Sequence, residues 1–176
     1  TGAEGFSNLS RTDGHSVYTK VNLDASRVQF LGATNFSILA AMQGQYALFN
    51  RPLLVAEQFS FGGAQFGQAY DPAQFTGDHG LAGKLEVRYD QDVNWHVMNH
   101  FQIFTFYDVG KVWNILGNTP GVPVSGASTG FGARLQFLKY LSGYLEWAQP
   151  LTAPAGAQLT KAPRIFFSIT LSGDTG

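Results

Sequence analysis

The 176-residue chain contains no cysteine. This absence excludes disulfide frameworks, thiolate zinc sites and cysteine nucleophiles. Charged residues make up only 13% of the sequence, about half of the usual share, and the formal net charge is −1. A chain without a basic surface has little to attract nucleic acid, so no nucleic-acid partner is expected.

Long hydrophobic runs are also absent. No stretch of about 18 apolar residues occurs, so the sequence predicts no membrane-spanning helix. The first residues, TGAEGFSNLSRTDG, lack a basic region followed by an apolar run, and we expect a signal peptide to be absent or already removed. If the protein enters a bilayer, it does so with strands.

The dominant hydrophobic period is two, which is typical of strands with one apolar and one polar face. Most of the alternating segments are about 9 to 14 residues long, which exceeds the usual globular strand and matches tilted strands that cross a bilayer. The sequence therefore predicts an all-β fold with eight antiparallel strands, at residues 17–30, 35–47, 55–61, 81–90, 101–113, 129–138, 141–151 and 164–171.

Charged residues in these segments lie opposite the apolar face: Lys84, Glu86, Arg88, Asp108, Arg134, Glu146 and Arg164. In a membrane barrel the apolar faces meet lipid and such charges line an aqueous interior. A soluble, eight-stranded binding barrel of lipocalin type would instead turn residues such as Phe36 and Phe167 inward, toward a ligand. Periodicity alone does not separate the two, but aromatic residues near the predicted strand ends favour the membrane barrel: Tyr89, Trp95, Trp113, Tyr140 and Trp147.

The connections predict an orientation. If the last strand ends on the periplasmic side, the long loops 64–80, 116–126 and 152–163 fall on the outer side. Lys139 and Tyr140 then form a tight inner turn, and 91–100 forms a longer one. The segment 31–34 would be an unusually short outer loop.

The loop 64–80 follows a glycine pair and contains further glycines and Pro72, so we expect a shaped loop with a function of its own. A first motif combines this pair with a loop aromatic residue, a glycine-aspartate-x-glycine and a strand carrying glutamate and arginine: Gly62, Gly63, Tyr70, Gly77, Asp78, Gly80, Glu86 and Arg88. A second motif, phenylalanine-x-aspartate-x-glycine, follows: Phe106, Asp108 and Gly110.

The order and spacing of these motifs resemble the transporters of two-partner secretion, which export haemolysins and filamentous haemagglutinins and belong to the superfamily of outer-membrane assembly barrels. The downstream segments GFGARLQF, which contains Arg134, YLEWAQPL and PRIFFSITLS look like the last three strands of that family. The resemblance implies a transmembrane, up-and-down β-barrel in the bacterial outer membrane.

In that family the loop folds back into the barrel lumen, where its arginine meets the aspartate of the second motif. Here Gln68 and Ala69 stand where the family has arginine and glycine. The resemblance thus pairs Gln68 with Asp108, and we expect Asp108 to recruit Arg88 or Arg134 or to stay hydrated, because a neutral amide replaces a cation.

Family members have an N-terminal periplasmic part and sixteen strands, of which this chain matches the last eight. We therefore expect residues 1–176 to be the C-terminal half of a barrel, although eight strands can also close by themselves. The implied function is an outer-membrane pore that secretes an unfolded partner protein; an assembly or insertion barrel is the alternative. The implied partners are a secreted passenger, outer-membrane lipid, and the N-terminal barrel half or another copy.

No enzymatic site is predicted. Glu86 and Glu146 could be read as an acid–base pair, but carboxylates among arginines inside a barrel are usually structural. His96 and His100 have a spacing that suits a metal only on a helix, and they lie in a predicted turn. The sequence predicts neither a cofactor nor a metal.

Overall fold

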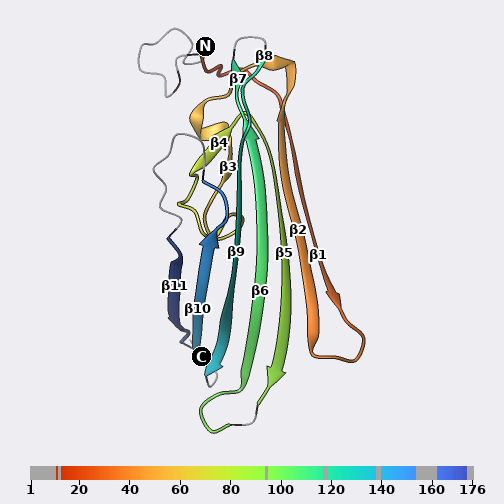
Figure 1. Cartoon of the computed structure of the whole chain (residues 1–176), viewed down its shortest axis with the longest axis vertical. Coiled ribbons are helices and arrows are strands. Elements are labelled where there is room, and N and C mark those ends of the chain that lie inside the picture. The colour runs from red at the N-terminus through yellow and green to blue at the C-terminus, as the bar shows by residue number, and fades with distance from the viewer. Residues whose placement is uncertain are drawn as a thin grey trace.

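A computed structural model describes residues 11, 13–93, 95–116, 119–137, 140–153 and 162–173. Its main feature is one antiparallel sheet in which each strand pairs with the next along the chain (Figure 1). The strands of this wall are β1 (Lys20–Phe30), β2 (Phe36–Ala47), β5 (His79–Asp92), β6 (His100–Trp113), β9 (Val124–Phe137), β10 (Leu141–Pro150) and β11 (Arg164–Leu171). The fold is therefore all-β, and the sheet is open, with β1 and β11 as the edges of its described part.

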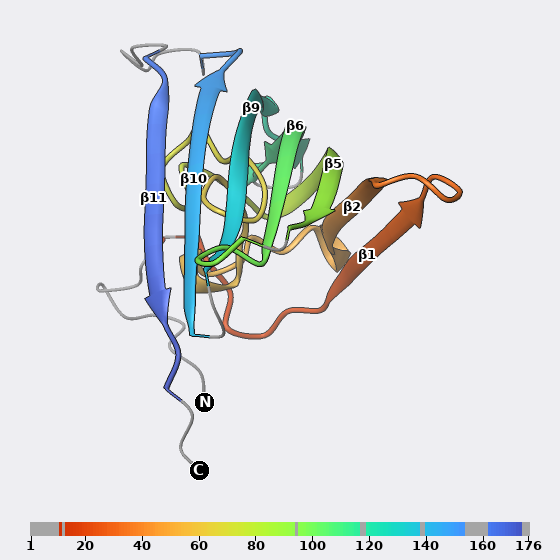
Figure 2. The same cartoon turned by 90° about the horizontal axis from the view of Figure 1, so that it is seen from below.

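The wall is curved, and Figure 2 shows the segment between β2 and β5 on its concave side. Alternation along the strands gives this concave face most of the charged residues and gives the opposite, convex face most of the exposed large apolar ones. Phe36, Ile165 and Phe167 lie on the convex face, where they are 44%, 69% and 78% exposed. This placement matches the membrane barrel and is the reverse of what the lipocalin-type alternative predicts.

The prediction of a wall strand at 55–61 is wrong. Val55–Glu57 forms a 3-10 turn, and only Phe59–Phe61 is a strand, β3. It pairs with β4 (Phe75–Gly77) in a separate two-stranded sheet that packs against β5, β6 and β9. The wall therefore has seven described strands where the sequence predicts eight.

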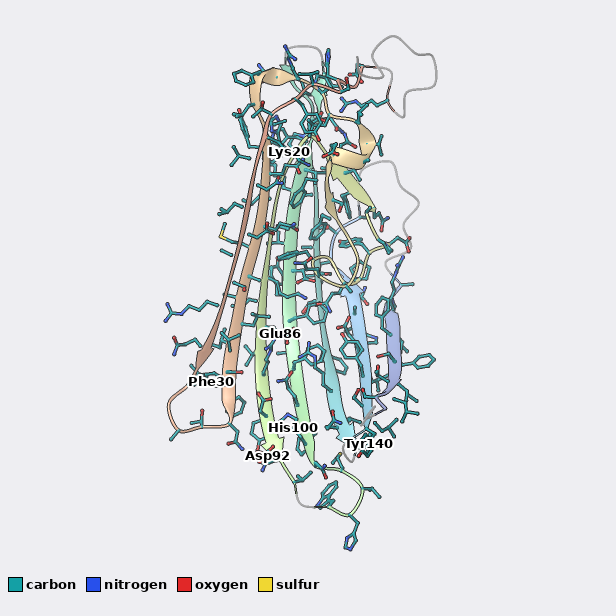
Figure 3. The ribbon with its side chains drawn as sticks, turned by 180° about the vertical axis from the view of Figure 1, so that it is seen from behind. Lys20, Phe30, Glu86, Asp92, His100 and Tyr140 are labelled. Carbon is teal, nitrogen blue, oxygen red and sulfur yellow. The ribbon has the colours of Figure 1, made fainter. Side chains whose placement is uncertain are left out.

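Because this strand is not part of the wall, the prediction that 31–34 is an outer loop is also wrong. The turn between β1 and β2 lies at the same end of the sheet as the connections from β5 to β6 and from β9 to β10 (Figure 1). Figure 3 shows Phe30, Asp92, His100 and Tyr140 toward this turn end and Lys20 toward the other, which we call the loop end. The short connection 31–34 is thus on the turn side, and the long connections are at the loop end; the turn predicted at Lys139 lies outside the described residues.

The remaining described elements are small and lie at the loop end: a 3-10 turn at Leu48–Asn50 and the two-stranded pair β7 (Ile115–Leu116) and β8 (Thr119–Pro120) (Figure 1). Among the described residues, no helix has the length and apolar character needed to cross a membrane.

Candidate functional site

The segment 62–74, which we call the docked segment, connects β3 to β4 and folds back on itself. Its glycines permit this path, because Gly62 and Gly67 have φ angles of 121° and 76°, which side chains disfavour. The amide of Gly62 donates to the carbonyl of Phe66 at 3.0 Å, and a Cβ on Gly62 would overlap the carbonyl oxygen of Asp71. The loop is therefore shaped by its backbone.

Glycines of the wall form the surface on which β3 rests. A Cβ on Gly80 would overlap the ring of Phe59, and a Cβ on Gly110 or Gly126 would overlap the ring of Phe61. Gly110 and Gly126 are register partners on β6 and β9, so their missing side chains leave one continuous depression. The motif glycines at 80 and 110 thus act by leaving room for aromatic rings.

Tyr70 fixes the far side of the docked segment to the loop end of the wall. Its ring is 2% exposed and packs against Phe61 and Phe75, with centroids 5.9 and 4.9 Å away. Its hydroxyl lies 2.7 Å from the carbonyl oxygens of both Ala127 and Thr152, to either of which its one proton can be donated, and it accepts from the amide of Ala127 at 3.2 Å. This hydroxyl satisfies backbone groups where β9 begins and β10 ends.

Asp108 of β6 receives the backbone of the docked segment. Its Oδ2 accepts the amides of Gly67 and Gln68, both at 3.1 Å, and the hydroxyl of Ser128 at 3.4 Å. The carboxylate has no exposed area, and its Oδ1 has no hydrogen-bond partner among the described residues. Lys84 is the register partner of Asp108 on β5, which places a positive charge beside it.

The side chain of Gln68 contacts a different carboxylate from the one expected. Its Nε2 donates to Oε2 of Glu146 on β10 at 2.6 Å, and the hydroxyl of Tyr144 donates to the same oxygen. Both Gln68 and Glu146 are buried. The contact with Asp108 is made by the amide of residue 68 and not by its side chain.

Arg88 and Arg134 both bind Glu86, so the expectation that either is recruited by Asp108 is wrong. Arg88 Nε and Arg134 Nη1 lie 2.6 and 2.9 Å from Glu86 Oε1, which is buried near the middle of the wall (Figure 3). The guanidinium of Arg134 also stacks on the ring of Phe104 at 4.0 Å. Two arginines thus compensate one buried carboxylate.

Asp78 joins the loop end of the wall to the beginning of the described chain. Arg11 Nη1 lies 2.7 and 2.8 Å from its two oxygens, and the amides of Leu53 and Ile115 donate to it at 2.8 and 2.7 Å. Asp78 has no exposed area. Arg11 carries no motif in the sequence, and the only signal that could have pointed to it is that a buried aspartate requires a cation.

An ion pair ties the docked segment to the edge strand β11. Arg164 Nη1 lies 2.7 Å from Asp71 Oδ1, and the hydrogen bond from this guanidinium lowers the pKa of Asp71 below its ordinary value of 3.8. The segment therefore contacts β6, β9, β10 and β11, which are consecutive strands of the wall.

The predicted site residues thus fall into three groups. Gly62, Gly63, Gln68 and Tyr70 belong to the docked segment, which meets Phe106 and Asp108 on β6, while Gly110 on the same strand receives the ring of Phe61. Gly77, Asp78 and Gly80 lie at the loop end, and Glu86, Arg88 and Arg134 form a separate cluster on the wall. Sequence reasoning did not assign Arg11, Lys84 or Tyr144 to the site.

The buried carboxylates of this site serve to hold the chain together. Each buried carboxylate of the site is engaged by donors from the chain: Asp78, Glu86, Asp108 and Glu146. No group of three or more histidine, aspartate or glutamate side chains in the described ranges is placed to hold a metal ion. His100, half-exposed, contacts Asp92 at 2.9 Å near the turn end.

Comparison with known proteins gives one family. The family model described as haemolysin secretion/activation protein ShlB/FhaC/HecB matches residues 1–133, which include the docked segment and the strands from β1 to β6. No curated protein matches the chain.

Proposed function

The chain belongs to the haemolysin secretion/activation family, and from this membership we propose that it forms part of the wall of a pore that secretes an unfolded partner protein. The family consists of bacterial outer-membrane proteins that act in two-partner secretion, and it is a family of transporters and not of enzymes. The pore, its passenger and the role of the docked segment are the proposed parts.

The observation that carries the proposal is the position of the docked segment on the concave face. In a closed barrel the concave face is the lumen, so the segment would occupy part of the conduit as a plug or gate (Figure 2). The charged residues of the same face, among them Lys84, Glu86 and Arg134, would line the remaining aqueous space. The exposed apolar residues of the convex face would meet lipid.

We also propose that further strands complete the wall. The edges β1 and β11 each have one strand neighbour in the described part of the chain, which leaves a row of backbone groups on each open side. An unpaired backbone edge is not viable in lipid, so these edges require partners in the membrane. Strands of an N-terminal barrel half, or of another copy, would supply them, with residues 1–176 as the C-terminal portion.

Export of a partner tests the proposal. The full-length gene product is expressed with a secreted protein encoded beside it, and the exported fraction is measured for the wild type and for Gln68→Arg. The arginine would turn the amide contact with Glu146 into an ion pair with a bidentate donor, and this would hold the segment more tightly. We expect the wild type to export and the variant to export more slowly.

Gln29→Arg is the matched control, because it makes the same change on the convex face of β1, away from the docked segment. It should export like the wild type. Absence of export from the wild type and from both variants would overturn the transporter proposal. Equal export by all three proteins would support a pore but would show that the docked segment does not control export.

A further inference from the structure

The convex face contains a groove that the secretion proposal does not use. It lies between β2, β5 and β6 toward the loop end, and its volume is about 580 Å³, which is within the usual range for small-molecule sites. Its walls are the apolar side chains of Met42, Leu81 and Val109, and Gly121 and Pro123 also line it. The groove is therefore apolar along most of its length.

The groove exists because Gly83 has no side chain. Gly83 is on the convex face of β5, and the nearest atom to a Cβ built on it would be the carbonyl oxygen of Ala41 at 3.8 Å. The flanking Met42, Leu81 and Val109 are 40%, 51% and 45% exposed, so they line the trough without filling it. A flexible hydrocarbon chain fits an open trough of this kind better than a rigid, polar ligand does.

The groove ends beside a cation. Lys111 lines it, is exposed on the convex face of β6, and has no hydrogen-bond or ion-pair partner in the described part of the chain. Among the described wall strands, only one other charged residue points to the convex face, Arg27, which lies toward the turn end and donates to Gln29 at 2.7 Å. An ammonium group at the border of an apolar surface favours an anionic group that lies at the same depth in the membrane.

We propose that this groove binds one acyl chain of a phosphorylated outer-leaflet glycolipid of the lipid A type, with a phosphate on Lys111. An apolar trough that ends at a lone cation is complementary to an amphiphile with an anionic head. The loop end carries the long connections, which face outward in barrels of this class, so Lys111 and the neighbouring Trp113 lie at the level of the outer leaflet. The inference rests on the membrane placement within the proposed function, and not on secretion.

Native mass spectrometry of the full-length protein tests the site. The protein is released from detergent after incubation with lipid A and an equal amount of phosphatidylglycerol, and the retained lipid is counted for each variant. We expect the wild type to retain lipid A and Lys111→Gln to bind it at least about tenfold more weakly, because a charge-assisted contact with phosphate is lost. Gly83→Leu should weaken binding similarly, because its side chain would fill the trough.

Arg27→Gln is the matched control, since it removes the other convex cation without touching the groove, and it should bind like the wild type. The proposal is overturned if the wild type retains no lipid A, if phosphatidylglycerol is retained equally, or if Arg27→Gln weakens binding as much as Lys111→Gln. Export measured on the same wild-type protein separates the two proposals. Export without retained lipid A removes only the lipid site, and retained lipid A without export removes only the transporter.

Discussion

Replacing Asp108 by asparagine should release the docked segment from the wall. The Oδ2 atom accepts two backbone amides at 3.1 Å in a place with no solvent exposure. A hydrogen bond to a charged group contributes about 1.5 to 3 kcal/mol and one between neutral groups about 0.5 to 1.5 kcal/mol. The substitution therefore costs about 1 to 1.5 kcal/mol for each bond, or about 2 to 3 kcal/mol in all, which is roughly a 30- to 140-fold shift in the docking equilibrium.

A single cysteine in the docked segment measures this shift. Ala69 is 2% exposed and packs against Phe104 and Phe106, and the chain has no cysteine of its own. In an Ala69→Cys background, the rate of labelling by a water-soluble maleimide reports the fraction of molecules with the segment undocked. Asp108→Asn should raise that rate by roughly 30- to 140-fold.

The control is Asp90→Asn, which removes one carboxylate charge from the concave face of the neighbouring strand. Asp90 accepts from Gln102 and has no contact with the docked segment. Its labelling rate should remain that of the Ala69→Cys protein. Equal labelling rates for Asp108→Asn and Asp90→Asn would refute the reasoning, because the effect would then come from net charge and not from the two amides.

Three further changes test contacts of the wall, the loop end and the docked segment. Gly110→Ala should lower the thermal unfolding temperature in detergent, because the new methyl overlaps the ring of Phe61 and overpacking costs about 1 to 3 kcal/mol; Gly83→Ala, on the open convex face, should not. Arg11→Gln should reduce the free energy of unfolding in urea by about 3 to 5 kcal/mol, because it leaves Asp78 buried without a cation, and adding Asp78→Asn should restore most of the loss. The contact of Asp71 with Arg164 should persist from pH 8 to pH 5 and be lost only as the pH falls below 3.8, because the pKa of Asp71 is lowered; the distance between spin labels at Ala64 and Ile165 measures this.

Each of these has an outcome that contradicts it. A Gly110→Ala protein as stable as Gly83→Ala would mean that β3 does not rest on the wall glycines. An Arg11→Gln protein that unfolds at the wild-type urea concentration would mean that Asp78 is compensated by its backbone donors alone. A spin-label distance that changes between pH 8 and pH 5 would mean that another group controls the edge contact.

Period-two alternation locates the wall strands because polar and apolar residues alternate along them, and in the interior strands one face is also covered while the other is exposed. The same signal fails at 55–61. Phe59 and Phe61 are buried and Ser60 is exposed, as in a wall strand, but the covered face rests on the wall instead of belonging to it. Alternation reports that a face is covered and not what covers it. The error then propagated to 31–34, because one extra strand inverts the side of every connection before it.

The sequence did not reveal the partners of Gln68, because one of its contacts is made by the backbone and the other reaches a residue far away in the chain. Every residue except proline carries a backbone N–H, so nothing in the sequence marks the amides of Gly67 and Gln68 as the donors to Asp108. The side chain of Gln68 meets Glu146, which is 78 residues away, and only the register of β9 with β10 brings that carboxylate into reach. The sequence motif predicts that the docked segment contacts β6. Its contacts with β9, β10 and β11 depend on the curvature of the wall, which the motif does not reveal.

The backbone and the side chain of residue 68 make separate contacts, and this determines which substitutions the position tolerates. The bond to Asp108 uses a backbone amide, so any residue but proline at this position keeps the donor. Only the bond to Glu146 depends on the glutamine side chain. A substitution at position 68 can therefore change the contact with β10 while the backbone contact with β6 is kept.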